Sequence, residues 1–200
     1  MSDHYYSEKP TVKSERKKIT ETITNDQYTF YVDRGIFSKT GLDFGSRLLI
    51  ESFELPNVVG TIVDVGCGWG PISISLAKRN PNIDFIALDI NERAVKLTEE
   101  NVKLNGVTNL HVMQSNLLEG HEGKYYSAII TNPPIRAGKN TVFKLYEQAA
   151  NALVKNGEIW IVIQKKQGAP STIAKLEDLG FDVEVIKKSK GYYIIRGKKC

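Results

Sequence analysis

The sequence has few of the residues that build disulfide-stapled or metal-binding proteins. Only two cysteines occur, Cys67 inside a glycine-rich turn and Cys200 at the last position, so a structural disulfide is not expected. The three histidines, His4, His111 and His121, show no metal-ligand pattern. We therefore expect a protein of the reducing cytoplasm that holds no metal.

Long apolar runs are absent as well. No run reaches the roughly 18 apolar residues that are needed to cross a bilayer. Residues 1–10 have no apolar centre, which is not typical of a secretory signal. We expect no membrane partner.

What the chain does contain fits one globular domain. Its 200 residues can bury a substantial core, and 41% hydrophobic with 25% charged residues is ordinary for a globular protein. The net charge of +4 is unevenly placed: residues 185–200 carry six basic residues and no acidic one, and residues 9–18 carry five basic residues against Glu15. These segments either follow a phosphate backbone or form solvated edges. The sequence leaves both readings open, and it leaves the oligomeric state open too.

Beyond a polar arm of residues 1–25, strand-like and helix-like segments alternate. The expected strands cover residues 61–65, 83–88, 110–113, 128–130 and 158–163, and the expected helices cover residues 71–79, 92–105, 141–153 and 170–179. This order predicts one α/β domain over residues 26–200, doubly wound, with a mostly parallel sheet between two layers of helices. Residues 181–186 and 192–196 are joined by a link too short for a parallel crossover, so they are predicted to form an antiparallel hairpin.

A glycine-rich turn follows the first strand of the alternating run. Gly66, Gly68 and Gly70 allow a tight turn and a close approach of the backbone to a ligand, at the strand end where such sheets bind ligands. Dinucleotide-binding folds use a similar turn, but this spacing lacks their third glycine position. Asp89 ends the second strand, where a carboxylate can accept from two ribose hydroxyls or can simply cap a helix. Asn116 follows the third strand and either faces an adenine edge or is a polar turn residue.

A second motif, Asn132-Pro133-Pro134, follows the strand at residues 128–130. The stretch Val63-Asp-Val-Gly-Cys-Gly-Trp-Gly70, then Asp89, then this motif, in that order, resembles the class I S-adenosylmethionine-dependent methyltransferases. Residues 35–38 (GIFS) and 42–49 (LDFGSRLL) narrow the resemblance to the RsmC-type ribosomal RNA guanine-N2 methyltransferases, and residues 160–171 are similar to stand-alone members of that family.

The resemblance covers nearly the whole chain and implies a Rossmann-like, seven-stranded sheet. It implies S-adenosylmethionine as cofactor, with the glycine motif from Asp64 to Gly68 at the methionine end, Asp89 on the ribose and Asn116 near the adenine. The family usually has Asp at position 116, so Asn116 departs from its pattern. Its members of RsmC type often carry two copies of this domain, whereas this chain has one.

The resemblance also gives Asn132-Pro133-Pro134 a chemical role. An exocyclic amine on a purine shares its lone pair with the ring and is a poor nucleophile. The Asn132 side-chain oxygen and the Pro133 carbonyl can accept its two hydrogens, which favours the pyramidal nitrogen of the transition state. Pro134 and Pro133 stiffen the loop. The alternative is a simple turn after a strand.

Five further positions are candidates for substrate contacts. Ile135 stands where many methyltransferases of this motif class carry an aromatic residue that stacks on the base, so Phe37 or Tyr31 is expected to stack instead. Arg136 and Lys139 either hold a substrate phosphate or belong to a solvated loop.

The leading hypothesis is an enzyme that methylates an exocyclic nitrogen of RNA, guanine N2 of small-subunit ribosomal RNA, with that RNA or the small subunit as partner. A second hypothesis keeps the role of Asn132-Pro133-Pro134 but changes the methyl acceptor to a protein glutamine amide or to adenine N6. The glutamine methyltransferases usually follow Asn-Pro-Pro with Tyr, which Ile135 does not match. A third is an RNA-binding or assembly module without catalysis.

Overall fold

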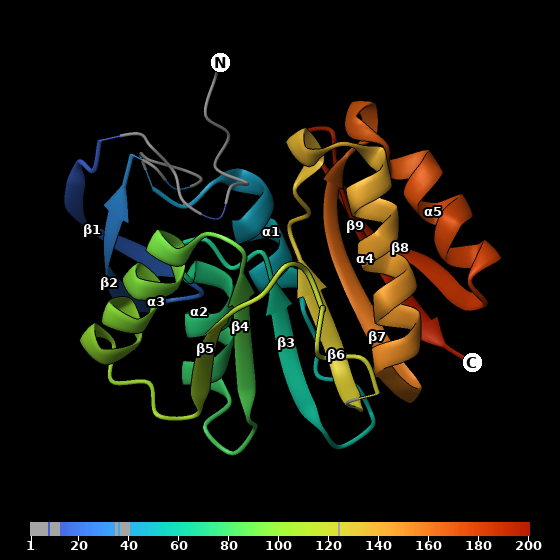
Figure 1. Ribbon diagram of the computed structural model, residues 1–200, viewed down its shortest axis with the longest axis horizontal. Coiled ribbons are helices and arrows are strands. Elements are labelled where there is room, and N and C mark those ends of the chain that lie inside the picture. Colours follow the sequence, from blue (N-terminus) through green and yellow to red (C-terminus); the bar gives the residue numbers. More distant parts are fainter. Residues whose placement is uncertain (1–7, 9–12, 35, 37–40, 124) are drawn as a thin grey trace.

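The computed structural model describes residues 8, 13–34, 36, 41–123 and 125–200. Within these residues a two-stranded hairpin precedes a seven-stranded sheet whose order is β5-β4-β3-β6-β7-β9-β8 (Figure 1). The strands are β1 Arg16–Ile23, β2 Asp26–Asp33, β3 Thr61–Val65, β4 Phe85–Asp89, β5 Leu110–Gln114, β6 Tyr126–Thr131, β7 Leu153–Gln164, β8 Phe181–Ser189 and β9 Tyr192–Lys199. The helices are α1 Phe44–Ser52, α2 Pro71–Arg79, α3 Glu92–Leu104, α4 Lys139–Ala152 and α5 Ala169–Asp178, with short 3-10 turns η1 Ile135–Ala137 and η2 Lys165–Gln167.

Strands β3 to β7 pair in parallel, and β9 and β8 are antiparallel. The predicted doubly wound α/β fold with a C-terminal antiparallel hairpin is therefore confirmed. Among the helices of the described residues, none is both long and apolar enough to cross a membrane.

Alternate side chains of the central strands enter two separate cores. On β3, Ile62 packs into a core with α1, α2, α3 and the β1–β2 hairpin, whereas Val63 and Val65 pack into a second core with α4 and α5. Because both faces of the parallel strands are covered, their sequences are nearly continuous apolar runs. The carboxyl ends of these strands are the edge left open for a ligand.

Within the expected arm of residues 1–25, the described residues include a strand. Residues 16–23 form β1, which pairs with β2 in an antiparallel hairpin. Only Ile19, Glu21 and Ile23 of this strand turn inward, so its pattern is too weak to recognise alone. Helix α1 was not expected either; Asp43 caps it by accepting a hydrogen bond from the Ser46 amide at 3.0 Å.

Two asparagines of α3 hold the hairpin in place. The Asn101 side chain accepts from the Tyr31 amide at 2.7 Å and donates to the Tyr31 carbonyl at 2.9 Å and the Trp69 carbonyl at 2.8 Å. One turn later, Asn105 makes the same pair of bonds to Thr29. These bonds satisfy backbone groups of β2 as a neighbouring strand would. Through Asn101 they also connect the hairpin to the glycine turn. Figure 1 shows the hairpin beside α3.

We predict that Asn101→Ala lowers the free energy of unfolding by about 2–4 kcal/mol, because it leaves three buried backbone groups without partners. Chemical denaturation measures the change, and Glu99→Ala, an exposed position of the same helix, is the matched control. A loss no larger than that of the control would contradict the role given to Asn101.

Candidate active site

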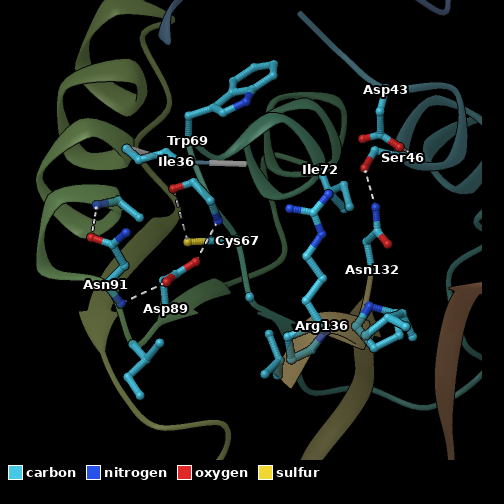
Figure 2. A pocket seen from close by; sticks show the side chains of 18 of the residues that line it. Ile36, Asp43, Ser46, Cys67, Trp69, Ile72, Asp89, Asn91, Asn132 and Arg136 are labelled. Carbon is cyan, nitrogen blue, oxygen red and sulfur yellow. Dashed lines mark hydrogen bonds between the residues drawn. The ribbon is translucent and has the colours of Figure 1, made fainter. Parts of the chain in front are cut away.

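A cavity opens at the carboxyl edge of the sheet. Strands β3 to β7 end there and β9 begins there, and its described lining runs from Ser115 after β5, through Asp89, Gly66 and Asn132, to Gln164 and Tyr192. The cavity lies over the point between β3 and β6 where the strand order reverses, as ligand sites of open α/β sheets do. Figure 2 shows Cys67, Asp89 and Asn91 on one side of it and Asp43, Ser46 and Asn132 on the other.

The glycine turn forms the floor between these two sides. Gly66 has φ +80° and Gly68 has φ +61°, which is the left-handed region that glycine adopts without strain. The amides of Gly66 and Cys67 both donate to the Leu88 carbonyl, at 2.8 and 3.0 Å. Among the described residues, a Cβ at Gly66 would meet only the Asn132 carbonyl oxygen, at 4.0 Å, so the backbone of the turn faces the open cavity.

Asp89 fixes the far side of the turn. One carboxylate oxygen accepts from the Gly68 amide at 2.8 Å, and the other accepts from the Asn91 amide at 2.9 Å. Removal from water raises the pKa of Asp89 to about 6, although hydrogen bonds from the backbone of Asn91, Gly68 and Ile90 oppose the shift. With three backbone donors, the carboxylate keeps one further acceptor site, and Asp89 lines the cavity.

Asp64 lies behind the turn rather than on the described cavity wall. It is buried on β3, and one oxygen accepts from the Ser73 amide in the first turn of α2, at 3.2 Å. Its other oxygen, Oδ1, meets no hydrogen-bond partner among the described residues. Burial raises the pKa of Asp64 to about 7, with a smaller contribution from the negative charge of Asp89.

The structure does not bring the Asn116 side chain to the described cavity wall. Its amide nitrogen donates to the Glu119 carboxylate at 2.9 Å. The neighbours Ser115 and Leu117 line the cavity instead, on the side of Asp89. The adenine contact expected of Asn116 therefore stays a prediction.

Asn132-Pro133-Pro134 leaves β6 beside the glycine turn. The Asn132 amide nitrogen donates to the Ser46 hydroxyl at 3.1 Å, across 86 residues of sequence, which leaves Oδ1 as the acceptor end of the side chain (Figure 2). Pro134 has φ −75° and ψ 72°, and the Ile135 amide donates to the Pro133 carbonyl at 2.8 Å, so the loop is an inverse γ-turn that proline suits. The Pro133 oxygen keeps one lone pair for a second contact.

The remaining candidate substrate-binding residues do not lie together. Ile135 and Arg136 line the cavity, and the Arg136 side chain lies between Asp89 and Asn132 in the view of Figure 2. Lys139 begins α4, with its ammonium group 4.9 Å from the centre of the Phe143 ring. Tyr31 lies on β2 beside the cations of Arg16 and Lys18. Phe37 lies outside the described residues.

The sequence analysis did not predict two pairs of residues that line the cavity. Asp43 and Ser46 carry a recognisable signal, because an acid three residues before a helix serine is a typical N-cap pattern. Gln164 and Tyr192 carry none, since they end and begin strands that look like ordinary core strands. In the described part of the chain, no group of three or more His, Cys, Asp and Glu residues is placed to hold a metal ion.

Comparisons with known proteins agree with this geometry. Residues 27–196 match the Methyltransferase small domain family. The chain is 53% identical to the uncharacterized protein YbxB of Bacillus subtilis over 200 residues, which cover all of both chains. It is 30% identical to ribosomal RNA small subunit methyltransferase C of Vibrio cholerae over 169 residues, which are 82% of this chain and 48% of that relative.

Among solved structures, the T. thermophilus 16S rRNA N2 G1207 methyltransferase (RsmC), in complex with AdoMet and guanosine, matches with a TM-score of 0.82 at 20% identity. The match covers 96% of this chain and 52% of that one, so this chain spans about half the length of the RsmC proteins. The RsmC-type resemblance expected from the motifs is confirmed. The chain belongs to the methyltransferase small domain family, whose methyl donor is S-adenosyl-L-methionine.

Proposed function

We propose that this methyltransferase transfers a methyl group to an exocyclic nitrogen of RNA, guanine N2 of small-subunit ribosomal RNA. The observation that carries the proposal is the position of Asn132: its amide nitrogen is held by Ser46, so its oxygen is the group available to an amine in a cavity it shares with the glycine turn. Within this proposal the protein acts in the cytoplasm, on ribosomal RNA or the small subunit.

The donor end of the cavity fits the cofactor. S-adenosylmethionine supplies an electrophilic methyl group on a sulfonium. In our proposal the turn from Gly66 to Gly68 lies against its methionine end, with Asp64 behind that turn, and Asp89 accepts from its ribose hydroxyls. The open face at Gly66 and the remaining acceptor site of Asp89 support this assignment. Apolar Ile90 and Leu117 line the same end and suit a flat adenine ring, beside the position expected for Asn116.

The acceptor end supplies hydrogen-bond acceptors rather than a strong base. Asn132 Oδ1 and the Pro133 carbonyl bind the two amine hydrogens, so that the nitrogen lone pair points at the methyl group. The γ-turn at Pro134 and the bond from Asn132 to Ser46 hold both acceptors before the substrate arrives, which lowers the cost of orienting them.

Basic side chains on one side of the cavity support RNA as the substrate. Lys187, Lys188 and Lys190 are exposed on the β8–β9 hairpin, whose turn leads directly into Tyr192. Lys165 and Lys166 of η2 lie next to that turn, because the Lys165 amide donates to the Gly191 carbonyl at 2.9 Å. At the amino-terminal end, by contrast, Arg16 is already paired with Glu100 at 2.6 Å. We therefore place the phosphate contacts on the hairpin, with Arg136 and Lys139 as further candidates.

The first prediction concerns Asp89 and pH. Because its pKa is raised to about 6, Asp89 is a carboxylate above this pH and a neutral acid below it. We expect cofactor affinity to fall as pH falls through 6 and to be about tenfold lower at pH 5 than at pH 8. At pH 8, Asp89→Asn is expected to weaken binding by about 1.5–3 kcal/mol.

Calorimetric titration with S-adenosylhomocysteine between pH 5 and pH 8 measures both effects. Asp84→Asn, an exposed acid at the other end of β4, is the control and should keep the wild-type profile. If the step near pH 6 survives in Asp89→Asn, another group is responsible for it.

The second prediction concerns Asn132. Asn132→Ala is expected to leave cofactor binding nearly intact and to slow methyl transfer on the order of 10²–10³-fold, because it removes one acceptor aligned with the transition state. Single-turnover methylation of naked ribosomal RNA, small subunits and intact ribosomes, with mass spectrometry of the product nucleoside, measures the rate and identifies the base. Asn140→Ala, an exposed asparagine of α4, serves as the control.

An N2-methylguanosine product that disappears in Asn132→Ala would support the proposal. Transfer to a protein glutamine instead of RNA would favour a protein substrate, and undiminished RNA methylation by the variant would make Asn132-Pro133-Pro134 a structural turn only.

The third prediction concerns salt. If Lys187, Lys188 and Lys190 contact phosphates, replacing all three by Gln should reduce the slope of log affinity against log salt by about 2 for single-stranded RNA. Filter binding at several salt concentrations gives this slope. The control is a triple replacement of Lys78, Lys103 and Lys155, exposed lysines near the amino-terminal ends of the parallel strands. It removes the same charge and should change the slope less. Equal changes would mean that only net charge matters.

A further inference from the structure

The acceptor end of the cavity contains a polar pair that no motif singles out. Gln164 ends β7 and Tyr192 begins β9, and the two residues are register partners in the sheet. The Gln164 amide nitrogen donates to the Tyr192 hydroxyl oxygen at 2.7 Å. Both side chains are partly buried, and both line the cavity that also contains Asn132.

One helix, α1, contacts both the Tyr192 ring and the Asn132 side chain. The ring lies against Gly45 so tightly that a Cβ there would be 2.8 Å from Tyr192 Cε1, and the next residue, Ser46, binds the Asn132 side chain at 3.1 Å. The Tyr192 ring also packs against the Phe44 ring, with 5.6 Å between the two ring centres. Tyr192 is thus fixed by α1, the same helix that orients Asn132.

The bond between Gln164 and Tyr192 determines what the pair offers to a ligand. The Gln164 nitrogen and a Tyr192 lone pair are already used, so Gln164 Oε1 remains as an acceptor and the Tyr192 hydroxyl as a donor. Neither of these groups meets a partner among the residues that the structure describes. An acceptor and a donor therefore line the same cavity as the acceptor oxygen of Asn132.

Two acceptors and one donor are the complement of one edge of guanine. Along that edge the N2 amine is followed by the N1–H donor and then by the O6 acceptor. We propose, on the basis of the function proposed above, that Gln164 Oε1 accepts from N1–H and the Tyr192 hydroxyl donates to O6 while Asn132 holds N2. Adenine does not fit, because an acceptor, N1, follows its N6 amine, and it would face the Gln164 oxygen.

The test is the equilibrium binding of free nucleosides to the full chain saturated with S-adenosylhomocysteine. Guanosine should bind most tightly. Inosine, which keeps N1–H and O6 but lacks the N2 amine held by Asn132, should bind more weakly than guanosine and more tightly than adenosine. Adenosine and 1-methylguanosine should bind about tenfold to hundredfold more weakly than guanosine. Tyr192→Phe and Gln164→Leu should each reduce the preference for guanosine over adenosine by about tenfold or more. Tyr193→Phe removes a hydroxyl from the adjacent residue, whose ring lies beside Lys188, and should keep the preference.

Equal affinity for guanosine and adenosine, including failure of both to bind at millimolar concentration, would overturn the proposal, as would an unchanged preference in both variants. Because this selectivity is read without methyl transfer, it is separate from the proposed function. Selective binding with no transfer to RNA would support the base-reading pair and reject the RNA substrate. Transfer to RNA guanine with unchanged selectivity in the variants would do the reverse.

Discussion

The parallel pairing of β3 with β6 is the constraint on which the site depends. Val65 is the register partner of Thr131, and the Thr131 hydroxyl donates to the Val65 carbonyl at 2.8 Å. The next residues, Gly66 and Asn132, therefore leave the sheet side by side, one leading into the donor turn and the other into the acceptor loop. The strand order reverses between these two strands, so no helix crosses over the gap and a ligand can lie across it. The turn proposed for the methyl donor and the loop proposed for the methyl acceptor therefore begin next to each other.

Helix capping supplies the finer positioning around this point. Asp43 caps α1 and so presents Ser46 to Asn132, Asp64 accepts from the first turn of α2, and Asn91 caps α3 while its own amide binds Asp89. The bonds to backbone amides satisfy groups that a helix start or turn would otherwise leave without a partner, and those of Asp43, Asp89 and Asn91 also orient side chains that line the cavity. Stability of the fold and preorganisation of the site are therefore produced by the same hydrogen bonds.

The donor side concentrates negative charge in a poorly solvated place. Burial raises the pKa values of Asp64 to about 7 and Asp89 to about 6, and each of these shifts means that ionisation at neutral pH costs folding free energy. A ligand with sulfonium and ammonium charges favours the ionised forms and offsets part of that cost. Asp64 is the more strongly shifted of the two, and its Oδ1 meets no hydrogen-bond partner among the described residues.

The sequence by itself determined the α/β class, the strand and helix order from residue 61 onward, and the positions of Gly66, Gly68, Asp89 and Asn132, because apolar periodicity, caps and short motifs are local properties. Only the tertiary structure decided that residues 16–23 form a strand, since that hairpin depends on side chains of α3 some 70 residues away. The tertiary structure also places the Asn116 side chain against Glu119. It places Ser46, Gln164 and Tyr192 on the cavity wall. Such contacts join segments that are distant in the sequence at one edge of the sheet. No local pattern encodes them, because strand register and helix packing select the partners as the chain folds.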